Sequence, residues 1–85
     1  MDQSQASMTI NVADDGTLFV GPDPTSMAGM IEQVVEQLAT VNQDPQRLSI
    51  VIRADRRAAS RTVNQVVVAL TQLGVQRVKV SVESQ

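Results

Sequence analysis

Apolar and polar residues alternate one by one over residues 8–12, and this period of two predicts a half-buried β-strand. Residues 17–20 follow the sequence Asp14-Asp15-Gly16 and are expected to be the return strand of a hairpin. Asp-Gly between two strands favours a tight primed turn, because glycine readily adopts the positive φ that such a turn requires. The glycine and prolines of residues 21–24 predict the end of the second strand.

Two stretches in the second half of the chain alternate in the same way, residues 48–53 and residues 77–82. In the first of them Val51 stands where a polar residue would continue the alternation, so this strand is the most apolar one. A strand with apolar residues on both sides is expected in a central place in the sheet.

Two longer stretches repeat apolar residues every three or four positions, which is typical of helices that bury one side. The first helix is expected to begin at Thr25 or Ser26, either of which can cap its free N–H groups, and to end before Pro45. The second follows a basic turn at residues 54–59 and is expected to end at Gly74. The apolar stripes consist of Met27, Met30, Ile31, Val34, Val35 and Leu38 in the first helix, and of Val63, Val66, Val67, Leu70 and Leu73 in the second.

The predicted order of elements is β-β-α-β-α-β, which is an α/β (α+β) fold. Helical connections between parallel strands are right-handed almost without exception, so both helices are expected on one face of the sheet. The predicted fold is therefore a two-layer sandwich, with two helices on one face of a four- to five-stranded mixed sheet. Residues 8–83 are expected to form this domain, between a disordered leader, residues 1–7, and a tail, residues 84–85.

Composition narrows the range of functions. The 85-residue chain has no Cys and no His, which excludes disulfides, the usual zinc sites and the commonest general base. Its net charge of −2 argues against nucleic-acid binding. The longest apolar run, residues 66–70, falls far short of the ~20 residues of a membrane-spanning helix. We therefore expect that the chain is not an enzyme and that it binds no metal and no cofactor. We favour a binding or assembly module.

Two groups of polar residues could carry chemistry, and each has a simpler structural interpretation. Asp14 and Asp15 could hold a metal ion, but no further acidic residues follow at the spacing of a calcium loop, so we expect a hairpin turn. The hydroxyls of Ser26, Ser60 and Thr62 have no histidine to act as a base, so we expect them to cap helices.

Four arginines surround an aspartate near the end of the third predicted strand. Ligands of α/β folds often bind at the carboxyl ends of parallel strands, so these residues could bind an anion or an acidic partner. The alternative is a solvated cluster that the aspartate neutralises, worth about 0–1 kcal/mol per exposed pair. No glycine-rich loop accompanies the group, which disfavours a phosphate site. Its members are Arg53, Asp55, Arg56, Arg57 and Arg61.

Two apolar features could contact another protein. Methionine suits adaptable surfaces, so Met27, Met30 and Ile31 could line a partner groove, although the helix needs the same residues to cover the sheet. The last predicted strand is expected at an edge of the sheet, where unpaired backbone groups recruit another strand. We predict weak homodimerisation through its residues Val78, Lys79, Val80, Ser81 and Val82.

Several of these stretches, in this order and spacing, resemble the ExbD/TolR family. The run Ala13-Asp14-Asp15-Gly16-Thr17-Leu18-Phe19-Val20-Gly21-Pro22-Asp23-Pro24 looks like the opening of its periplasmic domain. The run Ile50-Val51-Ile52-Arg53-Ala54-Asp55, followed by the stripe of the second helix and its closing glycine, looks similar as well. The resemblance covers roughly residues 8–82 and points to ExbD more than to TolR.

The resemblance implies the periplasmic domain of a single-pass inner-membrane protein that dimerises and acts with ExbB-like and TonB-like proteins. Such complexes use the proton gradient to drive TonB, which opens outer-membrane receptors for siderophores and vitamin B12. The proton-carrying aspartate of the family lies in its transmembrane helix, so no residue of this chain, Asp55 included, is expected to inherit that role.

Three classes of function stay open on these grounds. The first is an energy-transduction module of the ExbD kind, with a TolR-like component of the Tol-Pal envelope system as its variant. The second is a small-ligand regulatory domain, and the third is an enzyme fragment. A ligand domain would need a concave apolar pocket with converging polar groups.

Overall fold

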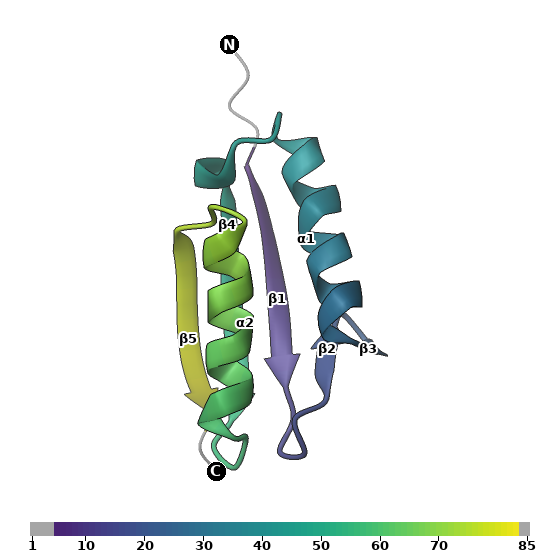
Figure 1. Cartoon of the computed structure of the whole chain (residues 1–85), viewed down its shortest axis with the longest axis vertical. Coiled ribbons are helices and arrows are strands. Elements are labelled where there is room, and N and C mark those ends of the chain that lie inside the picture. Colours follow the sequence, from purple (N-terminus) through teal and green to yellow (C-terminus); the bar gives the residue numbers. More distant parts are fainter. Residues whose placement is uncertain (1–4, 84–85) are drawn as a thin grey trace.

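The computed structural model describes residues 5–83, which form one sheet with two α-helices against it (Figure 1). The first strand begins at Ala6, slightly earlier than the pattern predicts, so the end of the expected leader belongs to the sheet. Residues 1–4 of that leader and the expected tail, residues 84–85, lie outside the described residues. The elements are β1 (Ala6–Val12), β2 (Leu18–Val20), β3 (Asp23–Thr25), α1 (Met27–Thr40), the 3-10 helix η1 (Pro45–Arg47), β4 (Leu48–Asp55), α2 (Ser60–Gln72) and β5 (Arg77–Glu83).

The sheet has five strands in the order β3-β2-β1-β4-β5. β4 runs parallel to β1 and to β5, whereas β2 runs antiparallel to β1 and to β3. The most apolar strand, β4, lies inside the sheet with a neighbour on each side, as predicted, although β1 occupies the exact middle of the order. The predicted α+β sandwich with a mixed sheet is therefore confirmed.

The sequence pattern missed β3. The glycine and prolines of residues 21–24 predict a stop, but Gly21 turns the chain with a φ of +67° and Asp23–Thr25 then pair with β2. Proline is tolerated there because β3 is an edge strand and bonds to a neighbour on one side. The extra reversal makes β3 run in the same direction as β1 and β4, so α1 joins two parallel strands.

The hairpin between β1 and β2 is confirmed, but its turn is wider than predicted. The N–H of Gly16 donates to the carbonyl oxygen of Ala13, and the N–H of Ala13 donates to the carbonyl oxygen of Thr17, both at 2.9 Å. Gly16 has a φ of +89°, whereas neither Asp14 nor Asp15 has a positive φ. The primed turn needs a positive φ at both central residues, so this loop is instead a three-residue turn with glycine in its left-handed position.

The first helix starts at a serine cap, as predicted. The hydroxyl oxygen of Ser26 accepts a hydrogen bond from the N–H of Gly29 at 3.0 Å. A side chain at Gly29 would collide with the hydroxyl oxygen of Thr25. Glycine therefore costs some helix propensity at this position but allows the close approach between β3 and the first turn of α1.

The second helix starts without such a cap. Its N-cap residue is Ala59, and no side chain accepts from its first turn, so the capping predicted for Ser60 and Thr62 is wrong. Both residues already lie inside the helix, and Ala59 at the N-cap position has no side-chain oxygen to accept from the free N–H groups. The predicted stop is confirmed, because Gly74 has a φ of +86° and its N–H donates to the carbonyl oxygen of Thr71 at 2.9 Å.

Both helices lie on the same side of the sheet, and the core fills the space between the two layers (Figure 1). Burial alternates residue by residue along β4, so the side of the sheet away from the helices stays open to solvent. The core consists of Ile10, Val12, Leu18, Met30, Val34, Leu38, Leu48, Ile50, Ile52, Ala54, Val66, Ala69, Leu70 and Val75.

Candidate protein-interaction site

β5 forms one edge of the sheet, beside β4 and beyond α2 (Figure 1). The register places its three valines next to buried residues of β4, so they lie on the side that the helices cover. Val78 packs against the core, but Val80 and Val82 are 44% and 62% exposed, because the helix layer stops short of this edge. A free row of backbone groups beside uncovered valines is a template for another strand.

The opposite edge of the sheet, β3, is a much poorer site for adding a strand. It has three residues, of which Pro24 has no N–H to donate and Asp23 carries a charge. Proline, charge and short length are the usual means by which edge strands avoid pairing with other chains. Between the two edges, the structure therefore favours β5 for strand addition.

The five residues predicted to bind an acidic partner do not share one surface. Arg53 lies on the open side of β4, and its Nε donates to Oε1 of Glu83 at 2.6 Å. Asp55, expected to neutralise the arginines, accepts instead from the backbone N–H of Arg57 at 2.8 Å and so orders the turn after β4. Arg61 lies on α2, on the helix side of the sheet. The cluster is thus divided between the two faces of the molecule.

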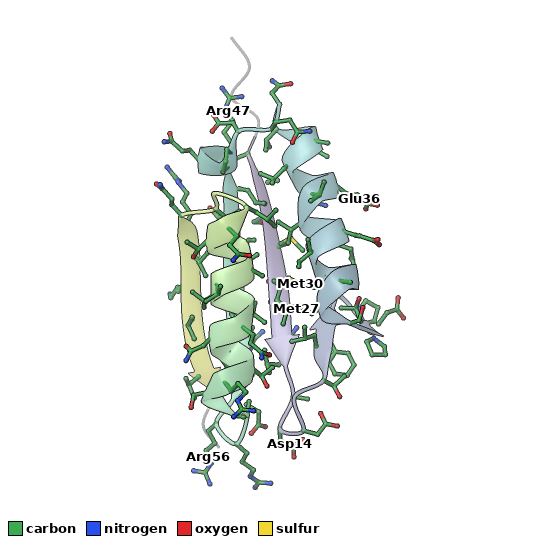
Figure 2. The ribbon with its side chains drawn as sticks, viewed as in Figure 1. Asp14, Met27, Met30, Glu36, Arg47 and Arg56 are labelled. Carbon is green, nitrogen blue, oxygen red and sulfur yellow. The ribbon has the colours of Figure 1, made fainter. Side chains whose placement is uncertain are left out.

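Arg56 and Arg57 are exposed in the turn between β4 and α2, at the lower end of the molecule in Figure 2, where Arg56 is labelled. A shallow polar depression of about 170 Å³ there is lined by Asp55, Arg56, Arg57 and Glu83. Its two carboxylates already have partners, because Asp55 accepts from the backbone of Arg57 and Glu83 pairs with Arg53. The N–H of Arg56 donates to the carbonyl oxygen of Glu83 at 3.2 Å, which joins this turn to the end of β5.

Glu83 is a charged residue at this end of the sheet whose contacts sequence reasoning missed. It lies 30 positions after Arg53, yet the parallel register of β4 and β5 brings the two side chains into an ion pair. The alternation of residues 77–82 predicts the strand but stops one residue before Glu83. Only the register between two strands could have identified this pair.

The methionine stripe of α1 is divided between the core and the surface. Met30 is buried in the core, whereas Met27 and Ile31 are half-buried and line an open groove of about 860 Å³ between α1 and α2. Figure 2 shows the two methionines close together on α1, toward the middle of the molecule. The stripe therefore covers the sheet and also contributes to a surface hollow.

The acidic hairpin acts as a turn. Oδ1 of Asp15 accepts from the backbone N–H of Thr17 at 2.9 Å, and this hydrogen bond lowers the pKa of the Asp15 carboxyl below its ordinary value. Within residues 5–83, no three His, Cys, Asp or Glu side chains gather where they could hold a metal ion. No helix in the same part of the chain combines the length and the apolar character that crossing a bilayer requires.

Comparison with known proteins gives one positive result. A family model described as biopolymer transport protein ExbD/TolR matches residues 1–85, the whole of the chain. The search of curated proteins found no match. The family match agrees with the resemblance in the hairpin, the third predicted strand and the second helix.

Proposed function

The chain belongs to the ExbD/TolR family of biopolymer transport proteins, and from this premise we propose that it is the periplasmic domain of an ExbD-like inner-membrane protein. In this role it dimerises and contacts a TonB-like protein, while an ExbB-like protein binds through the transmembrane helix. The complex couples the proton gradient to TonB-dependent import of siderophores or vitamin B12 through the outer membrane. The observation that carries the proposal is β5, a strand edge with free backbone groups and uncovered valines.

Homodimerisation through β5 gives those valines a partner. An antiparallel pair of β5 strands centred on Val80 sets the three valines of one copy against those of the other, on the same side of the extended sheet. It also sets Arg77 of each copy opposite Glu83 of the other, so opposite charges flank the apolar centre. A pair centred on Lys79 would oppose two ammonium groups, which is unfavourable.

A weak dimer is sufficient for this role. Lys79 lies in the middle of the edge and lowers its tendency to pair. Two copies held in the same membrane by their transmembrane helices have a high effective concentration, which offsets a weak contact. The isolated chain is therefore expected to show a concentration-dependent equilibrium between one and two copies.

The same edge suits an extended segment of a TonB-like protein. Strand addition supplies main-chain hydrogen bonds and needs no aromatic anchor, and this chain has a single aromatic residue, Phe19. The exposed Arg56 and Arg57 adjoin the end of β5 and would attract acidic stretches of the segment, mainly by raising the association rate. The dimer and the TonB-like segment then compete for one edge.

We propose that the chain acts by binding other proteins and catalyses no reaction. The chain has no His and no Cys, and a small-molecule reaction needs a nucleophile and base held together. A small-ligand regulatory role finds less support, because the buried residues within residues 5–83 include no polar side chain that would orient a ligand. A TolR-like role in the Tol-Pal system is the second candidate, because the matching family model includes both kinds of protein.

The proposal is tested by titrating the ¹⁵N-labelled chain with the periplasmic fragment of a TonB-like protein. We expect chemical-shift changes along residues 77–83 and a strong salt dependence, since exposed charges are screened beyond ~10 Å at 0.1 M salt. Arg56→Glu should weaken binding at low salt. Arg47→Glu, at the opposite end of the molecule in Figure 2, is the control; it also breaks the ion pair between Arg47 and Asp44, so circular dichroism of this variant checks its fold.

Two results would count against the proposal. Chemical-shift changes that do not include β5 would show that the partner fragment does not bind this edge. Equal effects of Arg56→Glu and Arg47→Glu on binding would show that Arg56 has no steering role. Tighter binding of a Tol-type partner fragment than of the TonB-like fragment would favour the TolR-like alternative.

A further inference from the structure

The helix layer carries a second surface, built differently from the β5 edge. The groove between α1 and α2 has a volume of about 860 Å³. Its apolar part is formed by Met27 and Ile31 of α1 and by Ala69 of α2. Val68 also lines the groove and is 54% exposed, although its neighbours one turn before and after it on α2 are polar.

We propose that this groove docks an amphipathic helix of a partner protein, with the apolar side of that helix between α1 and α2 and a carboxylate opposite Arg61. The docking site lies away from β5 and does not depend on the function proposed above. It adds an interaction that strand addition alone does not provide.

A helix fits this groove better than a strand does. Both walls are α-helices, whose backbone N–H and C=O groups bond within each helix and leave nothing for a partner backbone. An extended segment would bury its own backbone groups there without partners, at a cost in free energy. A helix satisfies its backbone internally and needs only side-chain contacts, which the groove provides.

The polar residues of the groove match the flanks of such a helix. Asn64, Gln65 and Gln72 of α2 line it and are exposed, so they can exchange hydrogen bonds with polar side chains of the occupant. The stretch of α2 from Arg61 to Gln72 is about three turns long, roughly 16 Å at ~1.5 Å per residue. This length requires an occupant of about three turns.

The charge of the groove determines the charge of its occupant. Arg61 is its single charged lining residue, and the two glutamates of α1, Glu32 and Glu36, do not line it. The ion pairs found among residues 5–83 do not include Arg61. A partner carboxylate beside Arg61 would therefore be favoured over a partner ammonium group.

Two synthetic peptides of about 15 residues, long enough to populate a helix, provide the probe. Each repeats leucine at three- and four-residue spacing, and the remaining positions are alanine with glutamate in one peptide and lysine in the other. Titrated into the ¹⁵N-labelled 85-residue chain, the glutamate peptide should shift the signals of Ile31, Gln65 and Val68. It should bind about fivefold tighter than the lysine peptide at low salt, the most that one exposed ion pair typically supplies.

Three variants make the test specific. Val68→Glu should weaken binding of the glutamate peptide at least tenfold, whereas Thr71→Glu, an exposed change on the same helix outside the groove, should not. Arg61→Glu should reverse the preference, so that the lysine peptide binds tighter. Circular dichroism and thermal unfolding of each variant would establish that these exposed substitutions leave the fold intact.

Three outcomes would overturn the proposal. The first is shift changes confined to β5 or no binding at all. The second is equal affinity for the two peptides, unaffected by Arg61→Glu. The third is that monomeric dodecylphosphocholine, below its critical micelle concentration, shifts the groove signals and displaces the peptide with the same potency in wild type and Arg61→Glu, which would identify the groove as a site for small amphiphiles.

Discussion

The two edges of the sheet, β3 and β5, face the same physical problem and differ in outcome. β5 presents seven residues with exposed valines, whereas β3 presents three residues, one of them a proline. Both strands follow a left-handed glycine, Gly21 before β3 and Gly74 before β5, so turn chemistry does not distinguish them. β5 is longer than β3 and has a complete row of backbone N–H groups. Another strand can therefore add to the sheet at β5 but not readily at β3.

The largest expected effect is the difference in stability loss between a variant inside the sheet and one at its open edge. Ile52 in β4 is fully buried, so Ile52→Ala should destabilise the chain by about 2–5 kcal/mol through lost contacts and a cavity. Val82 in β5 is 62% exposed, and Val82→Ala should cost less than about 0.5 kcal/mol. Urea unfolding measures both values. Similar losses for the two variants would show that Val82 is covered in solution.

The next effect concerns self-association through β5. Val80→Lys should weaken the dimer about tenfold or more, because it sets two ammonium groups opposite each other across the two-fold axis. Val35→Lys is the matched control, since Val35 on α1 and Val80 are both 44% exposed. Sedimentation equilibrium over a range of concentrations measures the two constants. If the wild-type chain stays monomeric at every concentration tested, the prediction that β5 mediates self-association is wrong.

A smaller effect would come from opening the blocked edge. Pro24→Val restores a backbone N–H to β3, so the variant should gain weak, concentration-dependent association at that edge. The measurement belongs in the Val80→Lys background, where association through β5 is already reduced. If the double variant sediments like Val80→Lys alone, the short length of β3 rather than its proline blocks the edge.

The smallest effect lies in the hairpin between β1 and β2. The hydrogen bond from the Thr17 N–H lowers the pKa of Asp15 in the folded state, so its ionised carboxylate stabilises the fold above the ordinary pKa of aspartate. That contribution disappears as the pH falls through the lowered pKa. Asp15→Asn should therefore flatten the acid limb of a stability–pH curve. Asp14→Asn removes a charge from the same turn and keeps the Asp15–Thr17 hydrogen bond, so it should change the limb less.

Periodicity predicted the elements that bury one side over several residues. β1, β4, β5 and both helices are long enough for a pattern to repeat, and the structure contains all of them. β3 has three residues, too few for a period of two to be recognised, and its proline signals a stop and an edge strand equally well. The hairpin was predicted from Asp-Gly between two alternating stretches. Asp-Gly occurs in more than one turn type, so it did not specify the three-residue turn that the structure contains.

Sequence proximity was a poor guide to the arginine group. Arg53 and Arg61 lie eight positions apart, but one belongs to a strand and points away from the helices, while the other belongs to the helix layer. The residue that pairs with Arg53 comes from β5, which depends on how the strands align and not on any local signal. The groove likewise depends on the spacing of two helices, although Met27 and Ile31 were recognisable as candidates for its wall.

The directions of the strands also determine how the domain responds to mechanical load. β1 starts near one end of the sheet and β5 finishes at the other end, with β4 between them and parallel to both (Figure 1). A pull that separates Ala6 from Glu83 acts along the strands and loads their hydrogen bonds in shear, all at once. A hairpin pulled at its open ends would instead release its bonds one after another. A domain attached to a membrane before β1 and gripped by its partner along β5 would thus bear tension along its most resistant direction.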